Sequence, residues 1–381
     1  MFCWAALRVS LVVLASTSSL ASSLCYPETT TRFSAQASQH PLQALLPAGK
    51  AVAQLYLRGG SDDENPGGNM EKKVVVLTGG TAGIGVGLLR ECVKHGAGKV
   101  YLLCRSAEKG AKVRDEVHAE FEKLETKTEI EIVKCEMSLM KDVKTAAEFV
   151  IANAGKIDVV FLNAGLIPGS NIIKTSEGVE EALAVNVCSA HLLARLLVPA
   201  LATGARVIFT GSDAGKAVKF TVDLEALQGE AGMGAAGFMQ YARTKTLMHM
   251  QAGALQDMLD AADLKVDVSV WHPGAVKTDI GKNISPTLLA CIHFIFFFVF
   301  RSVDQAASFG MHLALSKEAV HRGYLADGDT GRPSIKRGLP AKLISGAEDS
   351  KKCLDAWQAV EAVVAAALGG ASLPPLGQPK T

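Results

Sequence analysis

The chain has 381 residues, 49% of them hydrophobic, and a formal net charge of +1. This length suits one globular domain with additions at its ends, and the near-neutral charge argues against a nucleic-acid-binding surface. The eight Cys residues include no C-x-x-C pair, which argues against a zinc ribbon or a dense disulfide framework.

An N-terminal leader precedes the predicted domain. Arg8 and the apolar run Val9–Ala15 are followed by small residues, which predicts a signal peptide over residues 1–21. The apolar run is too short to span a bilayer, because a spanning helix needs about 20 apolar residues.

Residues 22–60 are predicted to be a second targeting segment. They are rich in Ser, Thr and Ala, and Glu28 is their only acidic residue, which is typical of transit peptides. The two segments together predict import into the plastid of an alga, with the endoplasmic reticulum and secretory pathway as the alternative. Residues 61–70 are predicted to be a polar linker, residues 71–366 a catalytic domain, and residues 367–381 a flexible tail.

Apolar runs alternate with helical patterns throughout the predicted domain. This alternation predicts an α/β fold, a doubly wound parallel sheet of about seven strands with helices on both faces. The strands are predicted near Lys73–Thr78, Lys99–Cys104, Glu129–Lys134, Ile157–Leu162, Arg206–Thr210, Lys265–Trp271 and Gly323–Ala326.

The first strand leads into a glycine-rich turn and a helical pattern from about Ile84 to His95. Strand, glycine turn and helix together form a dinucleotide-binding fingerprint. Gly79 would permit the tight turn, Gly83 would let the backbone approach a pyrophosphate, and Gly85 would let helix and strand pack closely. The spacing is G-x-x-x-G-x-G rather than G-x-G-x-x-G.

Arg105 directly follows the second strand. NAD-specific sheets carry an acidic residue there, which accepts a hydrogen bond from the ribose 2′-hydroxyl. The planar guanidinium of arginine suits a phosphate instead, so NADP(H) is predicted over NAD(H). The alternative is a surface arginine that does not contact the cofactor.

Tyr241 and Lys245 lie one helical turn apart, so their side chains share one face. A free phenol has a pKa of about 10, and a nearby cation lowers that pKa by favouring the phenolate. Such a tyrosine can pass a proton to or from a substrate oxygen near neutral pH. The pattern is weak alone and gains weight from the upstream motifs.

From about Lys72 to Val363 the chain resembles the short-chain dehydrogenase/reductases. Within them it is most similar to the retinol-dehydrogenase-like group, with light-dependent protochlorophyllide reductase as a near relative. The motifs that carry the resemblance are Thr78-Gly79-x-x-x-Gly83-Ile84-Gly85, Asn163-Ala164-Gly165, Asn186 in Ala-Val-Asn-Val, Ser212 after the fifth strand, Tyr241 with Lys245, and Pro273-Gly274 through Thr278.

The resemblance implies hydride transfer between nicotinamide and a carbonyl or alcohol carbon, with Tyr241 as the general acid or base. Ser212 would bind the substrate oxygen, Lys245 the nicotinamide ribose, and Asn186 a water on a proton path to solvent. Glu136 stands where the family usually has an Asp that contacts adenine. The cofactor-binding residues implied are Thr78, Gly79, Thr81, Gly83, Ile84, Gly85, Arg105, Glu136, Asn163, Ala164, Gly165, Tyr241, Lys245, Pro273, Gly274 and Thr278.

The segment Leu288–Phe300 is strongly apolar but short for a transmembrane helix. We expect it to cover a lipophilic substrate and to contact a membrane peripherally. The alternative is a buried helix in the core or at a dimer contact. Family members are usually dimers or tetramers built on long helices, so a homo-oligomer is expected through the regions Glu177–Leu201 and Phe238–Leu259.

The sequence therefore predicts an NADP(H)-dependent oxidoreductase acting on a lipophilic small molecule, such as a retinoid, a sterol, a long-chain aldehyde or a pigment precursor. No metal is expected, because no His cluster has ligand spacing. One alternative is an enzyme like light-dependent protochlorophyllide reductase, which uses the same Tyr and Lys. Another is a dinucleotide-binding scaffold protein without catalysis, against which the presence of Ser212, Tyr241 and Lys245 argues.

Overall fold

A computed structural model describes residues 69–124, 127–218, 227–229, 232–233, 237–276, 301–316, 323–326, 339–340, 344, 346–371, 373 and 376. The predicted leader and transit segment, Thr278 and Leu288–Phe300 lie outside these residues.

The described residues form a doubly wound sheet of order β3-β2-β1-β4-β5-β6-β7-β8. Its first seven strands are mutually parallel, and β8 (Leu339–Pro340) joins the β7 edge in the antiparallel direction. This confirms the predicted fold class. The parallel strands are β1 (Val74–Thr78), β2 (Lys99–Cys104), β3 (Glu129–Lys134), β4 (Ile157–Leu162), β5 (Leu201–Thr210), β6 (Val266–His272) and β7 (Gly323–Ala326).

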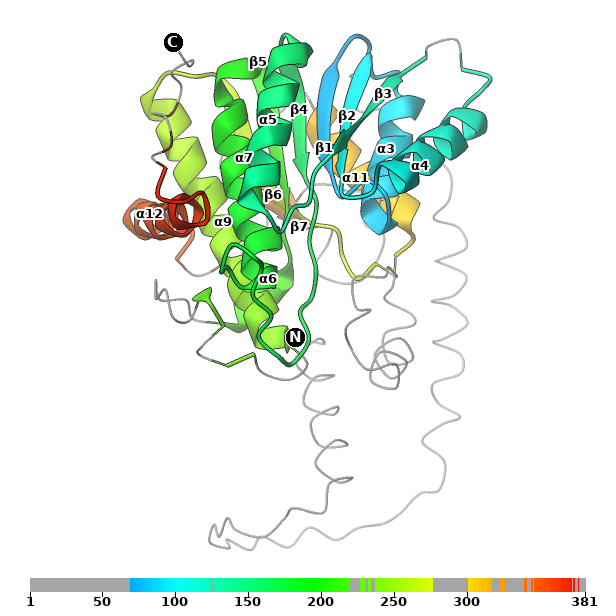
Figure 1. Ribbon diagram of the computed structural model, residues 1–381. Helices are drawn as coiled ribbons and strands as arrows, with labels where there is room; N and C mark the ends of the chain where they lie inside the picture. Colours follow the sequence, from blue (N-terminus) through cyan, green and yellow to red (C-terminus); the bar gives the residue numbers. More distant parts are fainter. Residues whose placement is uncertain are drawn as a thin grey trace, which may run out of the picture. The chain divides into compact units, whose positions relative to one another are not determined.

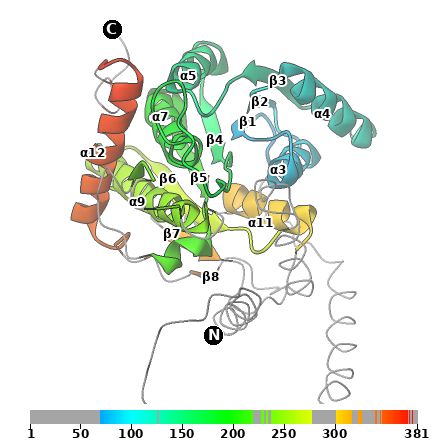
Figure 2. The ribbon, with the colours of Figure 1, turned by 60° about the horizontal axis from the view of Figure 1, so that its bottom comes forward.

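Helices cover both faces of the sheet (Figures 1 and 2). On one face lie α3 (Gly83–Lys94), α4 (Ala107–Glu120) and α11 (Val303–Leu315), and on the other lie α5 (Met140–Ala154), α7 (Ser189–Leu197), α9 (Phe238–Ala261) and α12 (Ser350–Ala367). Strand side chains alternate between these layers. Leu77 joins the core under α3 and α11, and Val76 joins the core under α5, α7 and α9.

The helical region after β4 begins later than predicted, at Glu181 rather than Glu177. The segment before it turns back at Gly178 (φ 80°), and the buried carboxylate of Glu180 caps the helix by accepting from the N–H groups of Ala182 and Leu183. The region comprises α6 (Glu181–Leu183), a π-helical turn η1 (Ala184–Cys188), α7 and a 3₁₀ turn η2 (Val198–Ala200). It is apolar and long enough to cross a membrane, but 94% of it is buried, which suits a core helix.

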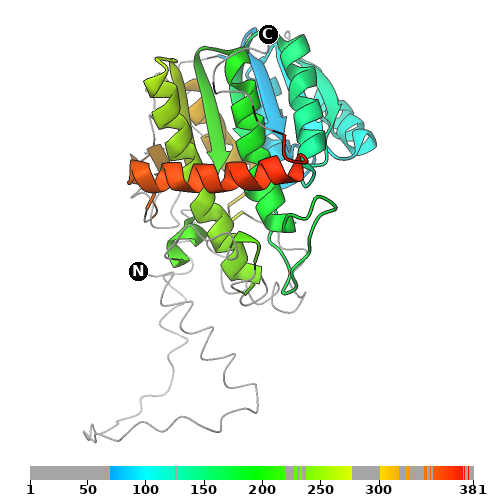
Figure 3. The same ribbon diagram turned by 60° about the vertical axis from the view of Figure 1, so that its left-hand side comes forward.

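The C-terminal helix α12 crosses the outer side of α9 and α7 (Figure 3). Its buried side includes Ala356, Trp357 and Val360. Glu361 lies 3.0 Å from the guanidinium of Arg195 on α7 and accepts a 2.8 Å hydrogen bond from the Trp357 indole. Part of the surface expected to contact a second copy is therefore covered by this chain itself, and the homo-oligomer stays a prediction.

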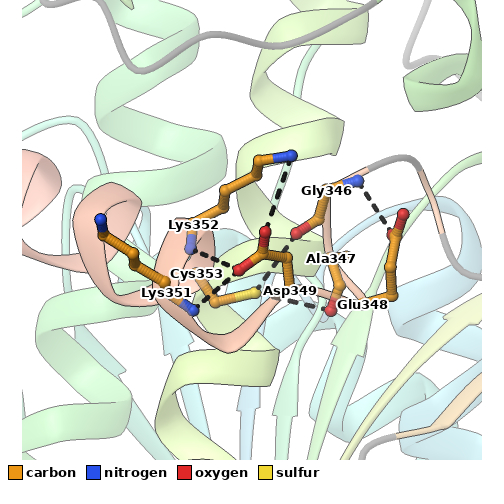
Figure 4. A network of polar contacts seen from close by, with 7 residues as sticks. All are labelled: Gly346, Ala347, Glu348, Asp349, Lys351, Lys352 and Cys353. Carbon is orange, nitrogen blue, oxygen red and sulfur yellow. Dashed lines mark hydrogen bonds and ion pairs between the residues drawn. The ribbon is translucent and has the colours of Figure 1, made fainter.

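A compact polar turn fixes the start of α12 (Figure 4). The Asp349 carboxylate accepts from the backbone N–H groups of Lys351 and Lys352, at 3.0 and 3.2 Å. The Cys353 thiol donates to the carbonyl of Ala347, and the Gly346 N–H donates to the Glu348 carboxylate at 2.9 Å. The helix thus begins with its first donors satisfied.

Candidate active site

The sequence motifs meet at the carboxyl edge of the central strands. The Thr78 hydroxyl, at the end of β1, accepts from the N–H groups of Asn163 and Ala164, at 2.9 and 3.0 Å. The Asn163 side chain donates to the Thr78 carbonyl and accepts from the Thr210 hydroxyl on β5. Thr78 and Asn163 therefore hold the ends of β1, β4 and β5 together, where α/β sheets bind their ligands.

The glycine turn after β1 has a backbone conformation and a close packing that require glycine. Gly79 has a φ of 69°, a conformation that side chains rarely adopt. A Cβ atom on Gly85 would lie 2.2 Å from the Gly79 carbonyl oxygen, so this close approach excludes any larger residue. The turn, which includes Thr81 and Gly83, opens α3, whose free N–H groups suit a pyrophosphate. The residues present thus fit a dinucleotide.

The two residues predicted to contact the adenosine end of the cofactor differ in whether their side chains already have partners in the protein. Arg105 is exposed just beyond β2 and forms no ion pair with any residue that the structure describes. The Glu136 carboxylate instead accepts from the backbone N–H and hydroxyl of Ser138, at 3.2 and 3.0 Å. Arg105 is available to a ligand, whereas Glu136 already stabilises its own turn.

The proposed acid–base pair lies on the first turns of α9. Tyr241 and Lys245 are 8% and 3% exposed, and the Lys245 Nζ is 5.6 Å from the centre of the Tyr241 ring. The ammonium donates to the Thr210 carbonyl at 2.8 Å. Ser212, two residues beyond the end of β5, lies near enough to Tyr241 to lower the pKa of the phenol, and its hydroxyl accepts from the Ala214 N–H at 3.2 Å.

Burial dominates the electrostatics of this pair in the protein alone. It raises the pKa of Tyr241, and the hydrogen bond from Ser212 only partly opposes that rise. It also lowers the pKa of Lys245 to about 7, so the amine is only partly charged at neutral pH. The lowered phenol pKa expected from Lys245 is therefore not reached without a further positive charge.

Asn186 lies in the π-helical turn η1 and is completely buried. Its side-chain oxygen accepts from the Leu166 N–H at 2.8 Å, and its amide donates to the Leu166 carbonyl at 2.9 Å. It also donates to the Thr244 hydroxyl on α9 at 3.0 Å. Asn186 thus joins the segment after Gly165 to the helix that carries Tyr241 and Lys245. Single π-helical turns are frequent at functional sites.

The segment after β6 begins at Pro273 and Gly274, and Gly274 has a φ of 82°. Arg301 lies against Gly274, and its N–H donates to the Ala275 carbonyl at 2.7 Å. Val276 and Arg301 are paired as an isolated parallel bridge. Arg301 therefore lies beside the segment that follows β6.

Several residues that the motifs did not indicate support the site. Thr210 accepts from the Trp271 indole at 3.1 Å, and Thr244 donates to the Tyr241 carbonyl at 2.7 Å. Gln240, next to Tyr241, donates to the buried Glu180 carboxylate at 2.8 Å. No sequence signal separates these residues from ordinary strand and helix residues. Among the described residues, no cluster of His, Cys, Asp or Glu could hold a metal ion.

Comparison with known proteins places this chain in a family. The short chain dehydrogenase profile matches residues 73–223. The oxidoreductase calI of Penicillium decumbens is 30% identical over 63% of this chain and 68% of its own. Retinol dehydrogenase 12 of Mus musculus is 30% identical over 65% of this chain and 74% of its own.

Solved structures agree on the fold. A short chain dehydrogenase from Burkholderia cenocepacia in complex with NADP superposes with a TM-score of 0.54 at 20% identity, over 68% of this chain and 97% of that one. The RhlG/NADP active-site complex of Pseudomonas aeruginosa gives 0.55 at 21% identity, over 69% and 98%. The protein is an NAD(P)-dependent oxidoreductase that acts on CH–OH or carbonyl groups. It belongs to the short-chain dehydrogenase/reductase family, with distant homologues among the retinol dehydrogenases and fungal enzymes.

Proposed function

We propose that this protein is an NADP(H)-dependent reductase or dehydrogenase of a lipophilic carbonyl–alcohol pair, with Tyr241 as the proton donor and acceptor. The observation that carries the proposal is the arrangement of three side chains, of which Tyr241 and Lys245 are buried and Ser212 is half-buried. The Ser212 side chain favours the ionised form of the Tyr241 phenol, and the Lys245 amine lies over the Tyr241 ring.

Bound nicotinamide supplies the hydride and, when oxidised, a positive charge near the site. Ser212 binds the substrate oxygen and aims it at Tyr241, which donates a proton in reduction and accepts one in oxidation. Lowering the phenol pKa from about 10 to about 7 requires roughly 4 kcal/mol of differential stabilisation. Lys245 contributes part of it once a ligand holds the amine in its charged form.

The preference for NADP(H) is supported by Arg105. It follows β2 at the position that faces the adenosine ribose in such sheets, and it is exposed. A guanidinium favours a 2′-phosphate, which an acidic residue would repel. Solved structures of the same fold in complex with NADP agree with this preference.

A lipophilic substrate is supported by the sequence between Val276 and Arg301, two residues that pair with each other. This part of the sequence contains Leu288–Phe300, an apolar run that we propose covers the substrate and contacts a membrane surface peripherally. The name of retinol dehydrogenase 12, which describes that relative alone, agrees with a lipophilic alcohol. We also propose a plastid location. Residues 1–70 fused to a fluorescent protein test it, and fluorescence confined to the endoplasmic reticulum would contradict it.

The deciding experiment follows the absorbance of NADPH with the full chain in mild detergent. The carbonyl panel should include all-trans-retinal, decanal and a 3-keto sterol, with glyceraldehyde as the polar control. We expect at least a hundredfold preference in kcat/KM for one lipophilic substrate over glyceraldehyde. Equal turnover of polar and lipophilic substrates would contradict the proposed substrate class.

A further inference from the structure

The two residues that flank Ser212 in the sequence are each contacted by a side chain from a distant part of the chain. His249, on α9 and one helical turn beyond Lys245, lies against Gly211, since a Cβ on Gly211 would be 2.9 Å from the His249 Nε2. Tyr324, on β7, donates a hydrogen bond to the carboxylate of Asp213. The catalytic serine therefore sits between two contacts that come from different elements.

These two side chains also contact each other. The rings of His249 and Tyr324 meet edge to face, with centroids 4.5 Å apart. Both residues are almost completely buried, at 3% and 1% exposure. Such aromatic pairs contribute about 0.5–1.5 kcal/mol beyond the area they bury. The pair thus forms one packed unit beneath the serine.

The charge at Asp213 strengthens the contact with Tyr324. Burial raises the pKa of the Asp213 carboxyl, but the charges of His272 and Lys216 and the hydrogen bonds from Lys216 and Tyr324 outweigh it and lower the pKa overall. The carboxylate is therefore ionised at neutral pH, and a hydrogen bond to an ionised group is stronger than a neutral one. Lys216 also pairs with Asp213 at 2.7 Å.

His249 provides a neutral surface. Burial, together with the charge on Lys245, lowers its pKa to about 3. Neither ring nitrogen has a hydrogen-bond partner in the described part of the chain. The imidazole thus contributes shape rather than charge, and its position on α9 ties the Gly211 backbone to the helix that carries Tyr241.

We propose that His249 and Tyr324 form a clamp that positions Ser212 against Tyr241. The position of Ser212 matters because its hydroxyl serves two partners at once: it accepts from the Ala214 N–H at 3.2 Å, and its O–H favours the ionised form of Tyr241. By fixing Gly211 and Asp213, the clamp holds the serine hydroxyl within reach of the phenol. Both are positioning residues, and the inference rests on the proposed role of Ser212.

The first test is independent of turnover. Tyr324→Phe removes the hydrogen bond to Asp213 and keeps the ring, and Asp213→Asn weakens the same contact should the first variant fold poorly. The matched control is Tyr101→Phe, because Tyr101 is a fully buried strand tyrosine whose hydroxyl has no hydrogen-bond partner among the residues that the structure describes. We expect Tyr324→Phe to accelerate hydrogen exchange in the peptide spanning residues 205–218 about tenfold and Tyr101→Phe to leave it unchanged. Equal exchange in wild type and Tyr324→Phe overturns the clamp.

The second test combines variants in a double-mutant cycle with decanal or all-trans-retinal. Tyr324→Phe should lower kcat about tenfold with the KM for NADPH unchanged. In a Ser212→Ala background it should lower kcat less than twofold, because the clamp acts through Ser212. If Tyr324→Phe lowers kcat as much in the Ser212→Ala background as in the wild type, the clamp is contradicted but the proposed function is not. Full activity of Ser212→Ala would instead overturn the proposed function and the clamp with it.

Discussion

The Lys245 amine donates to the carbonyl oxygen of Thr210 at 2.8 Å. This contact holds the amine beside the last residue of β5, close to Ser212. It also satisfies a strand carbonyl at the edge of the sheet, where the ladder of hydrogen bonds ends. Lys245 therefore has a structural partner in the protein before any ligand binds.

Tyr241→Phe should abolish most turnover without weakening cofactor binding. Removing a general acid costs 10²–10⁴-fold in rate, so we expect kcat to fall by at least about a hundredfold. The ring that packs in α9 is kept, so the dissociation constant for NADPH, measured by fluorescence titration, should change less than about twofold. Retention of full turnover would rule out the phenol as proton donor.

Lys245→Met should make the protein more stable and less active. Burial lowers the pKa of Lys245 to about 7, so between pH 7 and about 10.5 the unfolded chain binds more protons than the folded one. Burying the charged Lys245 side chain therefore destabilises the folded state at neutral pH, and this destabilisation decreases as the pH rises. We expect the variant to gain about 2 kcal/mol at pH 7 and little at pH 10. A lower melting temperature at pH 7 would contradict the burial argument.

Arg105→Asp should reverse the cofactor preference. The substitution removes a cation near the expected 2′-phosphate and introduces an anion that repels it and suits the 2′-hydroxyl. We expect kcat/KM for NADPH to fall about a hundredfold and that for NADH to rise. Arg114→Asp is the control, since Arg114 lies farther along α4 and pairs with its neighbour Asp115. Equal losses in both variants would indicate a general charge effect.

Acid should destabilise the protein through its buried histidines. Burial lowers the pKa of His191 and His272 to about 4 and that of His249 to about 3. Between about pH 6.5 and pH 4 the unfolded chain therefore binds more protons, and stability is lost as pH falls. From pH 7.5 to 5.5 each imidazole should cost about 1 kcal/mol. Urea unfolding at both pH values measures the loss, and His191→Gln should reduce it.

Glu361→Gln should weaken the attachment of α12. Glu361 pairs with Arg195, whose side chain is 9% exposed, so the loss of the carboxylate removes a charge from a mostly buried pair. We expect the free energy of unfolding to drop by about 1–3 kcal/mol. Asp263→Asn is the control, because the Asp263–Lys265 pair is exposed and such pairs contribute little. Equal losses of stability in both variants would show that the Glu361–Arg195 pair contributes no more than an exposed ion pair.

The sequence predicted the strands well because each is a short stretch rich in apolar or β-branched residues, either continuous or alternating with polar ones. β2, β3, β4 and β7 have the predicted bounds. β5 begins at Leu201, earlier than Arg206, because Leu201 pairs with Ile157 across a register shift that no local pattern signals. The motif residues meet at one edge as expected, since parallel strands carry their carboxyl ends there.

The supporting contacts were beyond sequence reasoning. Thr210 and Thr244 are ordinary residues of a strand and a helix until folding places them against Lys245 and Asn186. The raised pKa of Tyr241 could not be predicted from the sequence either. It results from burial, which depends on the packing of whole helices and not on the spacing of two residues. Pairing of Tyr324 with Asp213 links positions far apart in the chain.

The position of α12 has a consequence for synthesis. Because α12 is synthesised after α7 and α9, apolar side chains of those two helices stay exposed until Trp357 and Val360 of α12 have been made. A translation product that stops short of Asp349 would keep that surface bare and become a target for chaperones and proteases. Quality control of this enzyme is thereby tied to the completion of its last helix.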